Sequence, residues 1–231
     1  MKVLLVGKNT QKIEPVVKEA GFSIVSENPD VVISFGGDGT LLHAEREHPG
    51  IPKLPIRDSQ FCHKCSDHEE KTLLKKLLEN QLTLKTYKKL KTEVSGKTLL
   101  ALNDFSIRNA HPTHAIRFRI RDKLYIGDGI VVSTPFGSSA YFKSITNQSF
   151  SSGFGVAFNN VTEDIKPLFL NEYEEIKFEL VRGTADLTSD NSPDVYRINE
   201  GSSISFSLSD DVAKIYEADS LRCPNCEVIR G

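Results

Sequence analysis

The spacing of apolar residues changes near residue 82, and this change limits the folds open to the chain. Before it, residues 3–6 and 31–35 form short apolar runs, which are typical of strands buried inside a parallel sheet. A helix capped by Thr10 and ended by Gly21 is expected between them, followed by a strand at 22–25. This order of strand, helix and strand predicts a doubly wound α/β domain, Rossmann-like or flavodoxin-like.

A second helix is expected before the change in spacing. Asp67 and Glu70 approximate a capping box at its start. The apolar residues that follow share one helical face: Leu73, Leu74, Leu77 and Leu78.

After residue 82 apolar and polar residues alternate. Ile116, Phe118 and Ile120 alternate with three arginines, and a turn is expected at 122–123. Serines alternate with apolar residues over 203–209. A period of two is typical of antiparallel strands with one buried face. The sequence therefore predicts an α/β domain over 1–88 and an all-β domain over 89–212.

The composition excludes some classes of partner. The 231 residues carry a formal net charge of −2, with 39% hydrophobic and 26% charged residues. This charge gives no electrostatic reason to expect nucleic acid or an anionic membrane as the main partner. No apolar run is long enough to span a bilayer, and the first residues lack a signal-peptide pattern. We therefore expect a cytoplasmic enzyme or binding protein.

A glycine-rich loop follows the apolar run at 31–35. Gly36, Gly37 and Gly39 surround Asp38, and Thr40 is expected to begin a helix. Glycines let a polyanion approach backbone N–H groups, and a helix N-terminus favours phosphate. Asp38 would repel phosphate unless it meets a metal ion or a reacting hydroxyl group, so it is the candidate general base or metal anchor. The alternative is a tight turn with an incidental aspartate.

Two later segments carry polar groups suited to a nucleoside. Asn103 and Asp104 follow an apolar run and could bind ribose hydroxyl groups, although Asn-Asp is also common in turns. Residues 127–141 form a strand, a turn rich in serine and threonine, and a closing tyrosine. Hydroxyl groups and an aromatic ring suit a nucleoside. A hairpin with a core tyrosine is the alternative.

Together these motifs resemble the ATP-NAD kinase family in order and approximate spacing. The resemblance runs from the first strand to about residue 210 and rests on Gly-Gly-Asp-Gly-Thr, Asn-Asp and Asp-Gly-x-x-x-Ser-Thr-Pro-x-Gly-Ser-Ser-Ala-Tyr. It implies a kinase that phosphorylates the 2′-hydroxyl of the adenosine ribose of NAD, with ATP or polyphosphate as donor and Mg²⁺ as cofactor. It also implies a C-terminal β-sandwich, a site between the domains, a segment 213–231 that packs on the first domain, and a homodimer or homotetramer.

The resemblance also implies roles for single residues. Asp38 would be the catalytic base, and Gly37, Gly39 and Thr40 would lie near the phosphates. The remaining implied positions bind NAD: Asn103 and Asp104 at the adenosine, Asp128 at the nicotinamide half, and Ser139, Ala140, Tyr141 and Ser144 at the nucleoside pocket. The chain departs from the family pattern at 57–61, at Phe136 and at 145–147.

All four cysteines occur in two Cys-x-x-Cys pairs, Cys62 with Cys65 and Cys223 with Cys226. Four thiolates in such pairs suit a structural Zn²⁺ ion. His63 and His68 could replace a ligand, and redox pairs, disulfides or free thiols are the alternatives.

Three other functions remain open at this stage. A lipid or sphingoid-base kinase shares the Gly-Gly-Asp-Gly-Thr loop, and a nucleotide sensor would retain the pocket without turnover. A zinc-dependent nucleic-acid binder is the third, and the near-neutral charge argues against it.

Overall fold

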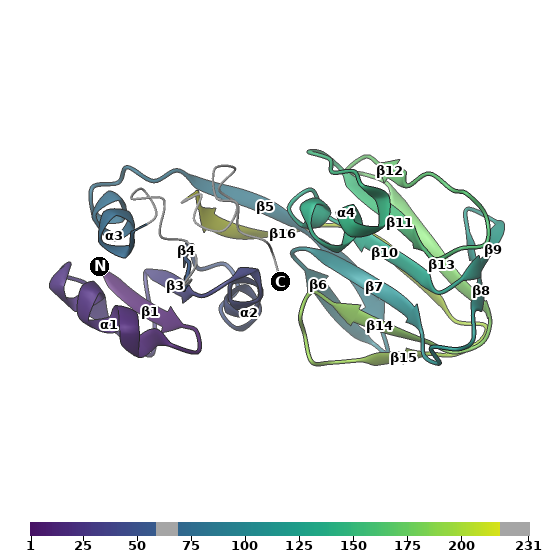
Figure 1. Cartoon of the computed structure of the whole chain (residues 1–231), viewed down its shortest axis with the longest axis horizontal. Coiled ribbons are helices and arrows are strands. Elements are labelled where there is room, and N and C mark those ends of the chain that lie inside the picture. Colours follow the sequence, from purple (N-terminus) through teal and green to yellow (C-terminus); the bar gives the residue numbers. More distant parts are fainter. Residues whose placement is uncertain (59–68, 218–231) are drawn as a thin grey trace. The chain divides into compact units, whose positions relative to one another are not determined.

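The computed structural model describes residues 1–58 and 69–217, which divide into two compact units (Figure 1). Of the described residues, 1–58, 69–87 and 213–217 belong to the first unit, and 88–212 belong to the second. Among the described residues, no helix has the length and hydropathy needed to cross a lipid bilayer.

The first unit is built on a parallel sheet with the strand order β2-β1-β3-β4. Within its described residues the same unit has three helices. The strands are β1 (Lys2–Val6), β2 (Ser23–Ile24), β3 (Val31–Phe35) and β4 (Lys53–Ile56), and the helices are α1 (Thr10–Glu19), α2 (Asp38–Glu47) and α3 (Glu70–Leu78).

One apolar cluster joins this sheet to α1 and α3. Val3 and Leu54 of the sheet are fully buried, as are Val17 of α1 and Leu74 of α3. Leu78 differs from the prediction, because 41% of it is exposed while its neighbour Leu77 is buried. The buried face of α3 therefore ends one residue earlier than its apolar pattern indicates.

The start of α1 also differs from the prediction. Asn9, and not Thr10, occupies the N-cap position, and no side chain caps the helix. The Asn9 amide donates instead to Asp58 beyond β4, so a tertiary contact takes the group that would have capped the helix. Gly21 ends the helix as predicted, with φ +87°. Helix α3 begins after Glu69, and Asp67 lies outside the described residues.

The second unit consists of two antiparallel sheets. One has the order β12-β11-β10-β7-β14-β15, and the other contains β16-β13-β8-β9 with β5 and β6. The strands of the first are β7 (Asp104–Asn109), β10 (Gly129–Ser133), β11 (Phe154–Asn159), β12 (Leu168–Leu170), β14 (Ala185–Ser189) and β15 (Tyr196–Ile198). Those of the second are β5 (Leu84–Val94), β6 (Lys97–Ala101), β8 (Ile116–Ile120), β9 (Lys123–Gly127), β13 (Glu175–Arg182) and β16 (Ser203–Tyr216).

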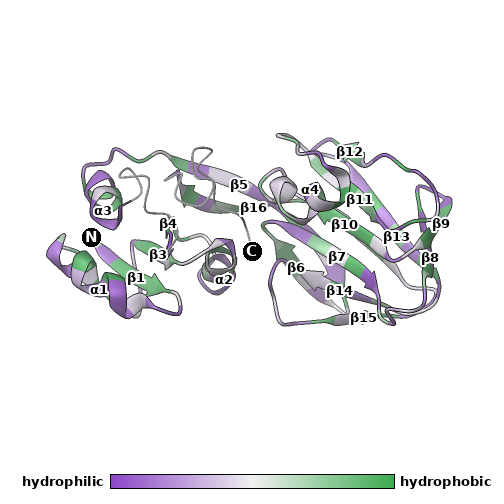
Figure 2. Cartoon of the chain, viewed as in Figure 1, coloured by the Kyte–Doolittle hydropathy of each residue, from purple (hydrophilic) through white to green (hydrophobic). Residues whose placement is uncertain are grey.

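Aromatic residues fill the space between these two sheets. The rings of Phe105 and Phe206 lie 5.5 Å apart and those of Tyr125 and Phe158 4.8 Å apart, and each pair joins the two sheets. The predicted alternation on β8 is confirmed, because Ile116, Phe118 and Ile120 are buried while the arginines between them reach solvent. Figure 2 shows hydrophobic and hydrophilic bands alternating in this way along β7.

The turn after β8 lies one residue earlier than predicted. Arg121 and Asp122 have φ values of +49° and +64°, as the two central residues of a type I′ hairpin turn do. Lys123 already belongs to β9, where it pairs with Ile120.

Strand β16 returns the chain to the first sheet. Its early residues pair with β13, and Ile215 pairs in parallel with Lys53 of β4. The predicted fold class is therefore confirmed: an α/β sheet, an antiparallel β-sandwich, and a chain that comes back to the first sheet. The predicted division into functional domains at 1–88, 89–212 and 213–231 remains a prediction.

Candidate functional site

The glycine loop connects β3 to α2 at the carboxyl edge of the parallel sheet. The Gly36 amide donates to the Ile56 carbonyl oxygen at 2.8 Å, and the Thr40 amide donates to the Gly37 carbonyl oxygen at 3.0 Å. A Cβ atom on Gly36 would lie 2.2 Å from the Thr40 hydroxyl oxygen, so a side chain would displace Thr40. Helix α2 begins at Asp38, two residues before the predicted start, and places Asp38, Gly39 and Thr40 in its first turn.

A polar contact joins the two strands that flank this loop. Strand β3 lies between β1 and β4 in the sheet. The residues that follow β1 and those that follow β4 therefore come together near the carboxyl end of β3. The Asn9 amide donates to Asp58 at 2.6 Å, and the Lys12 ammonium group lies 3.2 Å from the same carboxylate. The Asn9 hydrogen bond, helped by Lys12, lowers the pKa of Asp58. Neither Asn9 nor Lys12 is a predicted site residue, because nothing near them in the chain indicates this contact.

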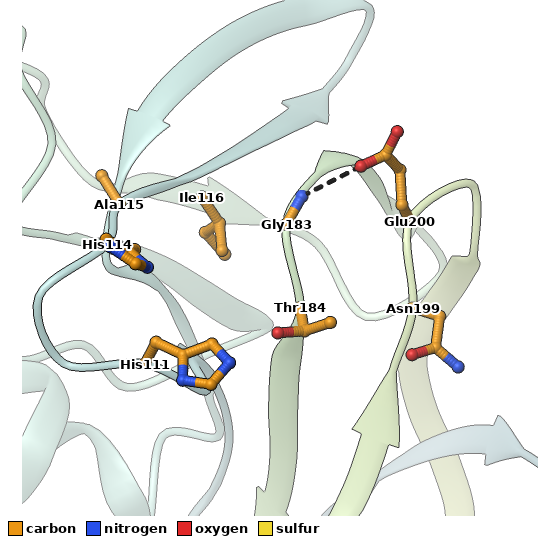
Figure 3. Close-up of a pocket in the computed structure, with 8 residues that line it drawn as sticks. All are labelled: His111, His114, Ala115, Ile116, Gly183, Thr184, Asn199 and Glu200. Carbon is orange, nitrogen blue, oxygen red and sulfur yellow. Dashed lines mark hydrogen bonds between the residues drawn. The ribbon is translucent and has the colours of Figure 1, made fainter.

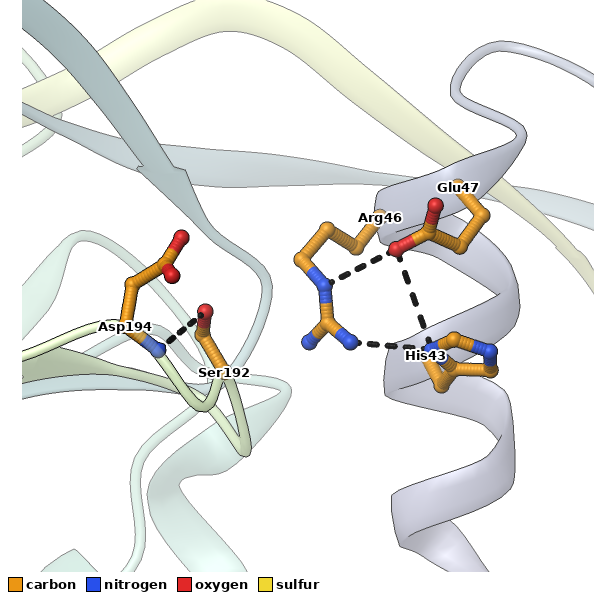
Figure 4. A network of polar contacts seen from close by, with 5 residues as sticks. All are labelled: His43, Arg46, Glu47, Ser192 and Asp194. Carbon is orange, nitrogen blue, oxygen red and sulfur yellow. Dashed lines mark hydrogen bonds and ion pairs between the residues drawn. The ribbon is translucent and has the colours of Figure 1, made fainter.

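The opposite end of α2 has a separate polar cluster (Figure 4). The Arg46 guanidinium group contacts the His43 ring at 2.9 Å and the Glu47 carboxylate at 3.3 Å. In the second unit, Figure 4 shows the Asp194 amide donating to the Ser192 hydroxyl oxygen at 3.2 Å.

In the second unit the Asn-Asp segment and the hydroxyl-rich turn lie in contact. The Thr134 hydroxyl group donates to the Leu102 carbonyl oxygen at 2.6 Å, and the Thr134 amide donates to the Asn103 carbonyl oxygen at 2.9 Å. A Cβ atom on Gly137 would lie 2.2 Å from the Asn103 carbonyl oxygen. Glycine at position 137 therefore permits the close approach of two segments that the sequence separates by about thirty residues.

Two buried oxygen atoms beside this contact lack hydrogen-bond partners among the described residues. They are Oδ1 of Asn103 and Oγ of Ser139. Leaving a buried polar atom without a partner costs about 1–3 kcal/mol. A polar ligand that donates to Asn103 and bonds to the Ser139 hydroxyl group would remove this cost.

Asp104 lies next to Asn103 and close to another buried carboxyl group. Burial, followed by the charge of Asp190, raises the pKa of Asp104 to about 7. Desolvation also raises the pKa of Asp190, although three backbone N–H groups and Lys89 oppose that effect. Sequence reasoning missed Asp190, which stands in a Ser-Asp-Asn-Ser stretch that resembles an ordinary turn.

The closing tyrosine begins a short helix. A 3₁₀ turn, η2 (Gly137–Ser139), leads through Ala140 into α4 (Tyr141–Thr146). The Ser144 hydroxyl group donates to the Tyr141 carbonyl oxygen at 2.7 Å. Ser139, Ala140 and Tyr141 are thus consecutive residues at the start of this helical segment, and Ser144 follows one turn later.

The departure from the family pattern at 145–147 ends this helix. Asn147 takes the left-handed conformation with φ +56°, and its amide donates to the Lys143 carbonyl oxygen at 2.8 Å. The Thr146 hydroxyl group donates to the Phe142 carbonyl oxygen at 2.9 Å and accepts from the Gln148 amide at 3.1 Å. These residues terminate α4 by helix-capping geometry.

Within this unit Asp128 lies far from Asn103 and the hydroxyl-rich turn. Residue 128 precedes β10, whereas the hydroxyl-rich turn follows it, and β10 pairs with β7 so that Gly129 faces Arg108 and Ser133 faces Asp104. Five strand residues separate the two ends, or about 16 Å. The Asp128 carboxylate accepts from Asn160 at 2.9 Å and from Asn109 at 3.3 Å, beside a hollow of about 380 Å³.

Another hollow, of about 430 Å³, lies beside the loop that precedes β8 (Figure 3). Figure 3 shows His111 and His114 on that loop, with Thr184 and Asn199 on the neighbouring chain segments. The Gly183 amide donates to the Glu200 carboxylate at 3.2 Å. None of the predicted site residues lines this hollow.

The predicted zinc ligands lie outside the described residues. Cys62, Cys65, Cys223 and Cys226 therefore stay a prediction from the sequence. Over residues 1–58 and 69–217, no group of three or more His, Cys, Asp or Glu side chains is arranged to hold a metal ion.

Solved structures define the class of fold. The NAD kinase from Archaeoglobus fulgidus, in complex with ATP, superposes with a TM-score of 0.77 at 18% identity and covers 96% of each chain. The yeast NADH kinase complexed with NADH has a TM-score of 0.80 at 14% identity and covers 97% of this chain and 84% of that one. The chain therefore has the NAD kinase fold.

The sequence comparisons agree with this fold, although no protein-family model matches the chain. The NAD kinase of Sulfurisphaera tokodaii is 29% identical over 177 residues, which cover 73% of this chain and 71% of that protein. NAD kinase 2 of Bacillus anthracis is 31% identical over 156 residues, which cover 60% of this chain and 58% of that relative. The chain is therefore similar in sequence to NAD kinases, the family that its motifs resemble.

Proposed function

We propose that this protein transfers the terminal phosphoryl group of a nucleoside triphosphate to the 2′-hydroxyl of the adenosine ribose of NAD. The observation that carries the proposal is the contact between the Asn103 segment and the hydroxyl-rich turn, with its two unpartnered buried oxygens. The similarity to NAD kinases supplies the reaction. The bond between the γ-phosphorus and its bridging oxygen breaks, a bond to the 2′-oxygen forms, and the products are NADP and a nucleoside diphosphate.

Asp38 is proposed as the general base that orients the 2′-hydroxyl and takes its proton. Its place in the first turn of α2 supports this role, because the loop glycines and the helix N-terminus favour the phosphates beside it. Gly37, Gly39 and Thr40 are proposed to face the triphosphate. Positioning and charge neutralisation provide most of the rate in such transfers.

Asn103 and Asp104 are proposed to bind the adenosine of NAD. The unpartnered Asn103 oxygen would accept a hydrogen bond from the nucleoside, and an ionised Asp104 would accept from a ribose hydroxyl. Ser139, Ala140, Tyr141 and Ser144 are proposed to line the nucleoside pocket, and Asp128 to contact the nicotinamide half.

A divalent metal ion accompanies the triphosphate in this family. Phosphate oxygens and the hydroxyl of Thr40 are hard oxygen donors that suit Mg²⁺, which is the ion we propose. When bound, the ion would neutralise phosphate charge.

Incubation of the protein with NAD, Mg²⁺ and alternative donors, with NADP as the readout, tests the proposal. We expect Asp38→Asn to lower kcat by at least about three orders of magnitude while NAD binding, measured by calorimetry, persists. Glu47→Gln is the matched control, because Glu47 is exposed at the other end of the same helix. Near-normal turnover by Asp38→Asn would refute the assigned base, and tight NAD binding without NADP formation would favour a nucleotide sensor.

Two further parts of the proposal concern a structural zinc ion and the oligomeric state. Structural zinc on the four cysteines is proposed from their spacing, and the metal content of protein purified without added zinc tests it. Assembly into a homodimer or homotetramer is proposed from the family and is tested by light scattering.

A further inference from the structure

Both the carbonyl groups and the amide groups of residues 102–104 are hydrogen-bonded. Its carbonyl groups accept hydrogen bonds from Ser133, Thr134 and Asp190: Thr134 bonds to Leu102 and Asn103, Ser133 Oγ bonds to Asn103 at 3.2 Å, and the Asp190 amide bonds to Asp104 at 2.9 Å. All three carbonyl oxygens therefore have partners.

The three amides of the same segment converge on one carboxylate. Asp190 Oδ2 accepts from the Leu102 amide at 2.9 Å, and Asp190 Oδ1 accepts from the amides of Asn103 at 2.7 Å and Asp104 at 3.1 Å. Hydrogen bonds to an ionised acceptor are about twice as strong as neutral ones. A single side chain thus fixes the N–H groups of three consecutive residues, 86–88 positions away in the chain.

Asp190 takes an unusual conformation to make these contacts. Its φ is +47°, a value that non-glycine residues adopt infrequently. It follows directly after β14, whose last residue Ser189 pairs with Phe105 of β7, so the ladder places the carboxylate beside the start of β7.

The backbone of this segment is bonded at all six polar groups, while the side-chain Oδ1 atom of Asn103 lacks a partner among the described residues. We propose that Asp190 is a positioning residue of the dinucleotide site, which holds the Asn103-Asp104 turn so that its side chains face the adenosine of NAD. This inference rests on the proposed function and adds a residue that does not itself touch the substrate.

The charge of Asp190 has a second consequence for Asp104. The two carboxyl groups repel each other, and Lys89 is the cation that acts on Asp190. Removing the Asp190 charge should therefore lower the pKa of Asp104.

Asp190→Asn is the appropriate variant, because asparagine keeps the size and tolerates a positive φ. Its amide retains one carbonyl oxygen and turns an NH₂ group toward a backbone N–H. Asp194→Asn is the matched control: it makes the same chemical change four residues later, at an exposed position. We expect Asp190→Asn to lower kcat/KM for NAD by about 10- to 100-fold and to leave KM for the triphosphate within about twofold.

Two measurements separate positioning from loss of the fold. Hydrogen exchange at the amides of residues 102–104 should become at least about tenfold faster in Asp190→Asn than in Asp194→Asn, with the rest of the second unit unchanged. Carbon NMR of the Asp104 carboxyl group should show a lower pKa in Asp190→Asn and no change in the control.

The outcomes distinguish this inference from the proposed function. If the wild-type protein binds NAD and Asp190→Asn binds and uses it equally well, the inference is wrong and the proposed function stands. Equal loss for both substrates, together with general unfolding, also overturns the inference. If the wild-type protein neither binds NAD nor forms NADP, the proposed function fails and the inference fails with it.

Discussion

Replacing Asp104 with asparagine should stabilise the second unit at pH 8 and weaken NAD binding at the same time. Burial and the neighbouring Asp190 raise the pKa of Asp104 from its ordinary value of 3.8 to about 7. Between these two values the folded protein keeps a proton on Asp104 that the unfolded chain has released. The free energy of unfolding therefore falls as the pH rises from about 4 to about 7, and it stays lower above that range.

The difference of about three pH units corresponds to about 4 kcal/mol at pH 8, because each unit is worth about 1.4 kcal/mol. Asparagine has nearly the same shape and carries no charge, so the free energy of unfolding of the variant does not decrease with pH in this way. We therefore compare the free energy of unfolding of Asp104→Asn with that of the wild type. The difference in favour of the variant should be about 2–3 kcal/mol larger at pH 8 than at pH 5.

Equilibrium urea unfolding of the whole chain at these two pH values measures the effect. Asp194→Asn serves as the control and should change the free energy of unfolding by less than about 0.5 kcal/mol at either pH. The reasoning is refuted if Asp104→Asn is less stable than the wild type at pH 8, or if its gain is the same at both pH values. Calorimetry with NAD then tests the second half of the prediction, a weaker affinity in the variant that is more stable.

Two glycines give further predictions. Gly7→Ala should destabilise the first unit by more than about 2 kcal/mol in urea unfolding, because φ is +153° and the new Cβ atom would lie 2.2 Å from the Phe35 carbonyl oxygen. An unchanged unfolding midpoint would contradict this. Gly137→Ala should raise KM for NAD about tenfold with little effect on KM for the triphosphate, because its Cβ atom would push against the Asn103 backbone; equal changes in both constants would argue against it.

The fold class was accessible from the sequence because hydrophobic periodicity is a local property. The largely apolar run at Val31–Phe35 predicts a strand buried on both faces, and all five of its residues, Ser34 included, are buried. The alternation at Ile116–Ile120 likewise predicts one buried face. Each pattern depends only on neighbours in the chain, so no knowledge of distant contacts was needed.

The errors have the opposite origin. Asn9 replaces Thr10 at the helix cap while its side chain bonds to Asp58, which lies 49 residues away. A capping preference is worth about 1 kcal/mol, and one tertiary hydrogen bond of similar strength can redirect it. The positions of caps and turns are therefore decided by small local energies that distant contacts easily change.

For the candidate site, the sequence by itself determined which segments carry the chemistry: the glycine loop with Asp38, the Asn103-Asp104 pair, and the hydroxyl-rich turn ending at Tyr141. Only the tertiary structure decided how they are held. It brings Asp190 onto the amides of the Asn103 segment and places Asp128 at the far end of β10. The physical reason is that motif composition is set by adjacent residues, whereas a carboxylate's partners are set by strand pairing across long sequence separations.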